Sequence, residues 1–160
     1  MSNSYRDIIP TFPLFEGFTS DGAAMVLERG TIHECAAGTV LFREGDPPNS
    51  VLLVLTGRLE VFVTRGDQEL VLLEAAPGAI IGEIAVLCGL NRTASVRAAM
   101  PSAVLEWPDT DFRRLLLGHA FLSQRILGRS LRVLIEKERS LIDSLLAKAR
   151  SGPASSRAPE

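Results

Sequence analysis

One segment near the middle of the chain combines a glycine, a carboxylate and an arginine at a spacing suited to binding an anion. Gly82 lets the backbone approach a ligand closely because it has no side chain, and residues 83–87 can form a short helix after it. The free N–H groups at the start of such a helix attract negative charge. Arg92 lies nine residues after Glu83, so it can return across the loop and clamp the same anion with two parallel hydrogen bonds. Thr93 adds a hydroxyl group beside it.

Glu83 needs a separate explanation, because a bound phosphate would repel its carboxylate. A carboxylate can instead accept a hydrogen bond from a neutral sugar hydroxyl of the same ligand. A phosphate, a sugar hydroxyl and an apolar wall from Ile84, Leu87 and Val96 together describe a nucleotide whose sugar and phosphate lie close together. The alternative is that Glu83 and Arg92 form a simple ion pair across a surface loop.

The elements that must position this segment are short strands. Apolar and β-branched runs alternate with glycine-containing turns over residues 31–108, and many short strands at such regular spacing favour a sandwich or barrel, with a jelly roll as the natural choice. The runs that predict strands are Thr39–Phe42, Val51–Thr56, Leu59–Thr64, Glu69–Leu73, Ala94–Ala98 and Ala103–Trp107. Trp107 ends the last run and is expected to be a core aromatic residue.

Helices are expected on both sides of the strand region. Thr19 or Ser20 can cap a short helix over Asp21–Arg29, whose apolar face would be Ala23, Ala24, Val26 and Leu27. Residues 110–149 change to helical periodicity, and Gly118-His119 is expected to divide this region into two helices. The predicted helices are Asp111–Leu117 and Phe121–Ala149.

The long C-terminal helix carries a row of leucines that needs a partner. Leucines recur at alternating spacings of about four and three residues, and Glu138 occupies one position of the row. The helix can pack on its own strands, or it can pair with a second copy of itself over residues 121–149, which we favour. Residues 150–160 are small, polar and proline-containing, and we expect them to be disordered.

Composition excludes several classes of function. Seventeen basic residues against nineteen acidic ones leave a net charge of −2, which disfavours a partner rich in phosphates such as DNA. Cys35 and Cys88 lie far apart, and with His33 and His119 they are too few and too scattered for a zinc site, an iron–sulfur cluster or the metal site of a cupin. No set of residues suggests nucleophilic or paired-acid catalysis. We therefore expect no enzymatic activity and no cofactor, and we expect Cys88 to be a small buried hydrophobe.

The chain offers no indication of a membrane or secretory location. Its first ten residues lack the basic and apolar regions of a signal peptide, and its apolar runs are far shorter than a membrane span. We expect a cytoplasmic protein with reduced thiols.

At the anion-binding segment the chain resembles the cyclic nucleotide-binding domain family, and in particular the sensor domain of bacterial catabolite-activator (cAMP-receptor) proteins. The resemblance spans about Phe15–Glu136 and is strongest in the phosphate-binding cassette. Its two halves here are Ile81-Gly82-Glu83-Ile84-Ala85-Val86 and Asn91-Arg92-Thr93-Ala94, preceded by family-like glycine patterns at 37–46 and 53–61. Ile81 replaces the usual aromatic residue and Asn91 the usual proline.

The resemblance implies an α+β, mainly β fold: an eight-stranded β jelly roll flanked by a short N-terminal helix and C-terminal helices. It implies that Glu83 binds the ribose 2′-hydroxyl and Arg92 the cyclic phosphate. The ligand-binding residues that it implies are Gly82, Glu83, Ile84, Ala85, Arg92, Thr93 and Ala94. Lys137 and Glu138 are possible base contacts from the long helix, as in bacterial dimers; alternatively both are solvent-facing helix charges.

The expected function is that of a stand-alone sensor in one domain, residues 5–149, with jelly roll 31–108 and C-terminal helices 110–149. cAMP is the favoured ligand, and cGMP is less favoured. The signal would pass through the long helix to a dimer interface or an effector protein. Only eleven residues follow Ala149, which leaves no room for the DNA-binding domain of the bacterial regulators. The alternative is an interaction or dimerisation module of the same fold that no longer binds nucleotide.

Overall fold

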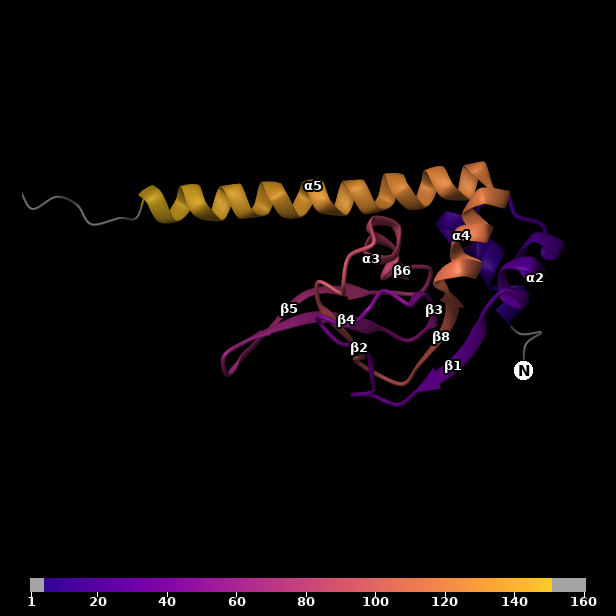
Figure 1. Ribbon diagram of the computed structural model, residues 1–160, viewed down its shortest axis with the longest axis horizontal. Helices are drawn as coiled ribbons and strands as arrows, with labels where there is room; N and C mark the ends of the chain where they lie inside the picture. Colours follow the sequence, from indigo (N-terminus) through magenta and orange to yellow (C-terminus); the bar gives the residue numbers. More distant parts are fainter. Residues whose placement is uncertain (1–4, 151–160) are drawn as a thin grey trace, which may run out of the picture. The chain divides into compact units, whose positions relative to one another are not determined.

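The computed structural model of the 160-residue chain describes residues 5–150 (Figure 1). Two short 3₁₀ helices, η1 (Ile9–Thr11) and η2 (Pro13–Phe15), precede helix α2 (Ser20–Glu28). The Thr19 hydroxyl accepts a hydrogen bond from the backbone N–H of Gly22 at 3.2 Å, so Thr19 is the N-cap of α2. The four apolar residues expected on the inner face of this helix are all buried.

Eight strands form two antiparallel sheets, which confirms the predicted eight-stranded jelly roll. The sheet orders are β1-β8-β3-β6 and β2-β7-β4-β5. The strands are β1 (Thr31–Cys35), β2 (Val40–Phe42), β3 (Ser50–Thr56), β4 (Leu59–Arg65), β5 (Gln68–Ala75), β6 (Ile80–Ile81), β7 (Ser95–Ala98) and β8 (Ser102–Pro108). The sequence patterns did not delimit β1, which buries only Cys35, or β6, which has only two residues.

The core lies between the two sheets and extends under the helices. Leu52 and Val54 of β3 face the core between the sheets, whereas Val51, Leu53 and Leu55 on the opposite face of the strand are also buried. Helices α3 (Glu83–Cys88) and α4 (Asp109–Gly118) contact this strand. Since β3 is covered on both faces, its sequence is a continuous apolar run rather than an alternating one.

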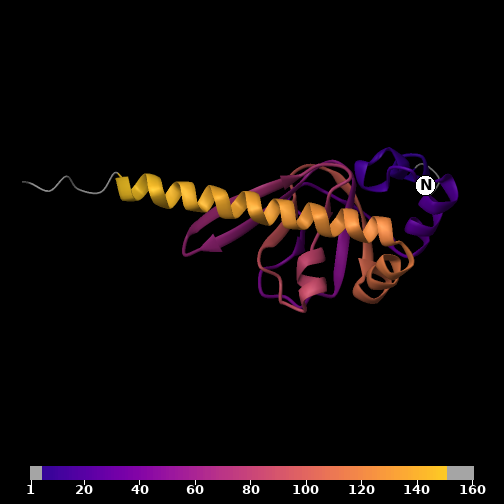
Figure 2. The same cartoon turned by 90° about the horizontal axis from the view of Figure 1, so that it is seen from above.

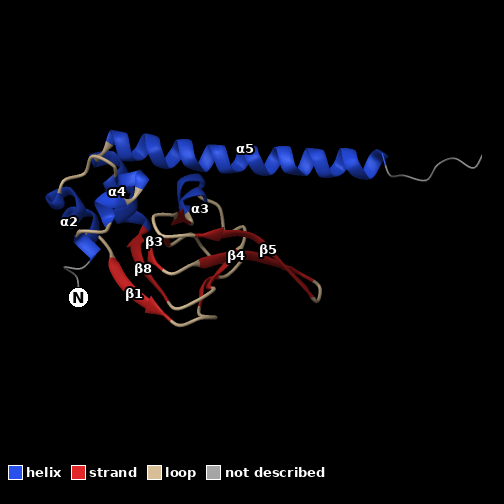
Figure 3. Ribbon diagram, turned by 180° about the vertical axis from the view of Figure 1, so that it is seen from behind, coloured by secondary structure: helices blue, strands red, loops and turns tan. Residues whose placement is uncertain are grey.

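Trp107 joins the N-terminal and C-terminal helices to β8, as expected of a core aromatic residue. Its ring is fully buried, with its centroid 6.0 Å from that of Phe112 in α4. Its indole N–H donates to the Val26 carbonyl of α2 at 2.9 Å. The three views place α2 and α4 beside the same end of the strands, while the β4–β5 hairpin extends beyond the other strands (Figures 1–3).

The C-terminal region is helical, with the break where the sequence predicts it. Helix α4 ends at Gly118, His119 follows, and α5 (Ala120–Arg150) is one continuous helix (Figure 2). The chain divides into two compact units, residues 1–124 and 125–160. The predicted disorder of 150–160 falls outside the described residues, apart from Arg150, which is the last residue of α5.

Candidate functional site

The predicted anion-binding segment begins with a tight turn from β6 into α3. Gly82 has a φ of 89°, a left-handed conformation that favours glycine, and it is the N-cap of α3. A Cβ atom on Gly82 would lie 2.5 Å from Nη1 of Arg92 and 2.8 Å from the Phe42 ring. The absence of a side chain therefore serves two purposes: it permits the turn, and it leaves space for the guanidinium of Arg92.

Arg92 is buried, with 5% of its surface exposed. Its Nη1 donates to the Gly82 carbonyl at 3.1 Å and its Nη2 to the Ser50 carbonyl at 2.6 Å. The guanidinium carbon lies 3.6 Å from the centre of the Phe42 ring, a cation–π contact. Two main-chain carbonyls and one aromatic face therefore fix the guanidinium beside the start of α3.

The guanidinium of Arg92 is incompletely paired. Its Nε–H group is buried and has no hydrogen-bond partner within residues 5–150. Burial lowers the pKa of Arg92 from its usual high value, and the charges of Glu106 and Asp46 oppose that shift. Two carbonyls and a ring hold Arg92 in the interior, and Glu83 is buried as well, so neither side chain lies at the surface as the alternative of a surface ion pair would require.

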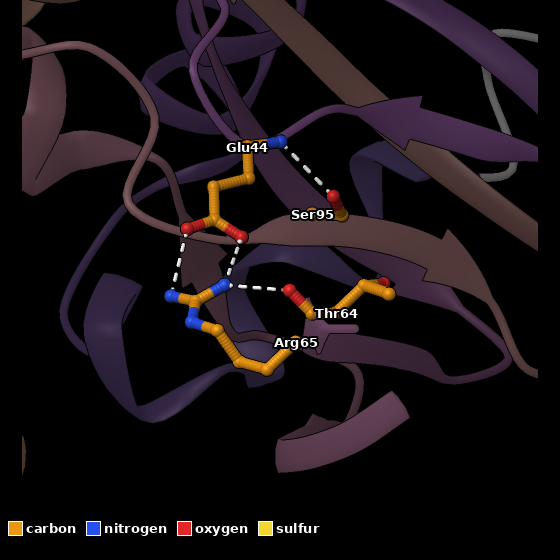
Figure 4. Close-up of polar contacts among 4 residues, drawn as sticks. All are labelled: Glu44, Thr64, Arg65 and Ser95. Carbon is orange, nitrogen blue, oxygen red and sulfur yellow. Dashed lines mark hydrogen bonds and ion pairs between the residues drawn. The ribbon is translucent and has the colours of Figure 1, made fainter. Parts of the chain in front are cut away.

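A loop before β3 holds the backbone around Arg92. The N–H of Gly45 donates to the Arg92 carbonyl, and the N–H of Arg92 donates to the Asp46 carbonyl, each at 2.8 Å. The N–H of Glu44 donates to the hydroxyl of Ser95 at 2.9 Å (Figure 4). Residues 44–46 therefore bind Arg92 of the cassette through two hydrogen bonds and the first residue of β7 through a third.

The other predicted site residues fall into two groups. Glu83 is the first residue of α3 and only 8% exposed; Ala85 is buried, Ile84 and Ala94 are half-buried, and Thr93 is exposed. Lys137 and Glu138 are exposed on the part of α5 that belongs to the second unit. The structure brings Gly82 and Arg92 into direct contact, whereas the ligand contacts of all these residues stay predictions.

Sequence reasoning missed two residues of this site. Phe42 supplies the aromatic face for the guanidinium, and the main chain of Ser50 supplies a carbonyl. Phe42 lies within the family-like glycine pattern at 37–46 and Ser50 lies four residues after it, which was the available indication, but no local rule connects either residue to an arginine 42 to 50 residues later.

The remaining cysteine and histidine residues do not form a second site. Cys88 is exposed at the end of α3, so its predicted burial is wrong: the helix stops at Gly89 and leaves the Cys88 side chain at the surface. His33 lies 3.0 Å from a carboxylate oxygen of Glu106 in a half-exposed pair. Within residues 5–150 there is no group of three or more side chains suited to hold a metal ion. Over the same residues, none of the helices could span a lipid bilayer.

The structure places the buried Arg92 side chain against the backbone of the Gly82 turn, within the segment whose sequence resembles a phosphate-binding cassette, and a family comparison assigns this region. The family model for the cyclic nucleotide-binding domain matches residues 32–119. The chain belongs to this family. The match includes all eight strands except the first residue of β1, together with α3 and α4, so the regulatory cyclic nucleotide-binding domain comprises the site and the jelly roll around it.

Three relatives illustrate the range of proteins that contain this domain. Acetyltransferase Pat of Mycolicibacterium smegmatis is 44% identical over 70 residues, which is 44% of this chain and 20% of Pat. The cAMP-dependent protein kinase regulatory subunit of Blastocladiella emersonii is 30% identical over 114 residues, 71% of this chain and 28% of that subunit. The solved structure of the Thermus thermophilus catabolite activator protein has a TM-score of 0.73 and 26% identity, over 84% of this chain and 63% of that one. The chain thus spans only about a quarter of these two curated relatives.

Proposed function

We propose that this chain is a cyclic nucleotide sensor that binds cAMP, with Arg92 on the cyclic phosphate and Glu83 on the ribose 2′-hydroxyl. The observation that carries the proposal is the buried guanidinium of Arg92, whose Nε–H has no partner among the described residues. No enzymatic role is proposed for the domain. The predicted absence of a cofactor and the cytoplasmic location stay predictions.

The donors of Arg92 support an anionic ligand. A guanidinium has five N–H donors, and within residues 5–150 two hydrogen bonds join that of Arg92 to the protein, at Gly82 and Ser50. A buried donor that is left without a partner costs about 1–3 kcal/mol, and more when it is charged. A phosphate oxygen would satisfy Nε–H and neutralise a charge that burial otherwise destabilises. The Gly82 and Ser50 carbonyls fix the plane of the guanidinium, and the remaining N–H groups of Arg92 can bind the ligand.

The proposal also includes contacts with the ribose and the base. Glu83 is buried at the start of α3, and Arg92, in the loop before β7, donates to the carbonyl of Gly82, the residue that precedes Glu83. We favour cAMP over cGMP because the kinase subunit from Blastocladiella emersonii is named for cAMP. Lys137 and Glu138 of α5 are proposed as base contacts from the long helix, and cGMP remains the second ligand to test.

The long helix supports a second part of the proposal, a homodimer formed through residues 121–149. Large apolar side chains of α5 are exposed along a row with coiled-coil spacing. They are Leu127, Leu131, Leu134, Ile135, Leu141, Ile142, Leu145 and Leu146. A second copy of the chain presents the same row and could cover it, and ligand binding would act by favouring one arrangement of this helix. An effector protein is the alternative partner.

The same exposed row favours one competing function, an interaction or dimerisation module that does not bind nucleotide. The two functions differ in what happens at Arg92. In the interaction module, no ligand would complete the pairing of the guanidinium. Substitution of Arg92 would then leave dimerisation or partner binding unchanged.

Isothermal titration tests the binding proposal. The protein is unfolded and refolded to remove co-purified nucleotide, and it is then titrated with cAMP and afterwards with cGMP. The Arg92→Ala variant is titrated in the same way. The control is Arg58→Ala, because the side chain of Arg58 is exposed and pairs with Glu74. Loss of a buried charged partner costs roughly 2–5 kcal/mol, so Arg92→Ala should bind about 30- to several-thousandfold more weakly. Absence of binding by the wild type, or equal affinity in Arg92→Ala, would refute the proposal.

Sedimentation equilibrium tests the dimer. Leu141→Glu places a charge in the exposed row, so it should convert a dimer into a monomer, while Arg150→Glu at the end of α5 serves as the charge-changing control. A wild-type chain that stays monomeric at protein concentrations up to about 100 μM would contradict the homodimer.

A further inference from the structure

An ion pair outside the cassette connects the β4–β5 hairpin to the loop that supports Arg92. Arg65, the last residue of β4, binds the Glu44 carboxylate with both terminal nitrogens, Nη1 to Oε2 and Nη2 to Oε1, each at 2.9 Å (Figure 4). The same Nη1 donates to the Thr64 carbonyl at 2.8 Å, which orients the guanidinium along its own strand. Two parallel bonds fix the geometry more strictly than a single contact does.

Glu44 is joined to the cassette as well as to the hairpin. Its backbone N–H donates to the hydroxyl of Ser95, and its neighbours Gly45 and Asp46 exchange backbone hydrogen bonds with Arg92. Phe42, whose ring makes the cation–π contact with the Arg92 guanidinium, lies two residues before Glu44 in the same chain segment. A displacement of the 44–46 loop would therefore move the backbone of Arg92 and the ring beneath its side chain together.

We propose that the Glu44–Arg65 ion pair is a positioning clamp that holds Arg92 in its phosphate-binding orientation by fixing the 44–46 loop to the β4–β5 hairpin. Neither residue touches the ligand in this proposal; both act through the loop. The inference rests on the proposed nucleotide-binding function and adds two residues to it that lie outside the cassette.

The exposure of the pair indicates a role in positioning rather than in overall stability. The side chains of Arg65 and Glu44 are 67% and 34% exposed, and exposed ion pairs add little to the free energy of folding. The Arg65 hydrogen bond lowers the pKa of Glu44, so the carboxylate is ionised at neutral pH and the pair is intact there. A weak contact can still decide which of several loop orientations is populated.

The hairpin contains a matched control. Arg58, the residue before β4, forms an ion pair with Glu74 of β5 at 3.1 Å, and both side chains are 53% exposed. This pair makes no contact with the 44–46 loop among the described interactions of its two side chains. Its removal should therefore reproduce the loss of a surface ion pair without a change at Arg92.

The test compares cAMP affinity and the Arg92 environment across both pairs. Glu44→Gln, Arg65→Met and the double variant are titrated with cAMP beside Arg58→Met. Each clamp variant should bind about two- to sixfold more weakly, and the double variant no more weakly than the singles, because one clamp is lost in all three. The charge exchange, Glu44→Arg combined with Arg65→Glu, should restore part of the affinity. Thermal midpoints measured in parallel should change little.

A spectroscopic readout separates positioning from general structure. The NMR signal of the Arg92 Nε–H group, assigned by its loss in Arg92→Lys, should shift in Glu44→Gln without nucleotide and stay in place in Arg58→Met. An unchanged signal with wild-type affinity in the clamp variants would overturn the clamp while the sensor function stands. Absence of cAMP binding by the wild type itself would instead overturn the proposed function, and the clamp with it.

Discussion

Replacing Gly82 with alanine would put a methyl group at the contact between the α3 turn and Arg92. The left-handed φ of 89° adds backbone strain of about 1–2 kcal/mol for any residue with a Cβ atom. Gly89, at the other end of the same helix, has a φ of 66° and nothing within 4 Å of its added Cβ. Gly89→Ala is therefore a control that adds comparable strain without a steric conflict.

The two substitutions differ in what the new methyl group meets. At Gly82 it would lie 2.5 Å from Nη1 of Arg92 and 2.8 Å from Cε2 of Phe42, well inside contact distance. The end of an arginine side chain is flexible, so it can move away from the methyl group. That movement, however, breaks its bonds to the Gly82 and Ser50 carbonyls and removes the phosphate donor from its place. The thermal midpoint should fall by about 2–8 °C in both variants, since 1 kcal/mol corresponds to about 2–4 °C in a chain of this size.

Affinity should separate the two variants. Loss of the buried charged partner predicts about 30- to several-thousandfold weaker cAMP binding in Gly82→Ala. Gly89→Ala should stay within a few-fold of the wild type, because Arg92 is undisturbed. Isothermal titration and differential scanning fluorimetry on both proteins provide the two measurements. Equal affinities for the two variants, at similar midpoints, would refute the argument that Gly82 keeps space for the guanidinium.

Three further substitutions or reactions probe the fold around the site. Trp107→Phe leaves the buried Val26 carbonyl without its donor, so urea denaturation should show a loss of about 1–3 kcal/mol in the free energy of unfolding. Gly57→Ala should lower the thermal midpoint by more than strain alone would, because the added Cβ would lie 2.6 Å from a backbone oxygen; a shift of under 2 °C in a chain of this size would contradict this. In a thiol titration of the native protein, Cys88 should react at once, whereas Cys35 is buried, burial raises its pKa, and it should react only on unfolding. Two fast thiols would show that Cys35 is accessible.

Local patterns in the sequence were sufficient for most elements. The cap at Thr19 and the break at Gly118-His119 each depend on a few neighbouring residues, and the structure confirms both. The hydrophobic pattern of the sequence did not predict a strand or the exposure of a side chain where tertiary contacts outweigh local propensity. Strand β1 has little apolar alternation and owes its existence to pairing with β8, and the exposure of Cys88 depends on where α3 ends.

The binding hypothesis for the cassette comes from the sequence, because the types and spacing of Gly82, Glu83 and Arg92 restrict what a short turn can bind. The contacts that hold the Arg92 side chain in place could not be derived from the sequence. The Ser50 carbonyl is 42 residues away in the chain and the Phe42 ring is 50, and both reach the guanidinium only because strands pair in one register across two sheets. Side-chain type and spacing are local properties, so the sequence determines them directly. Contacts between distant strands are set by packing of the whole core, and only the tertiary structure decides them.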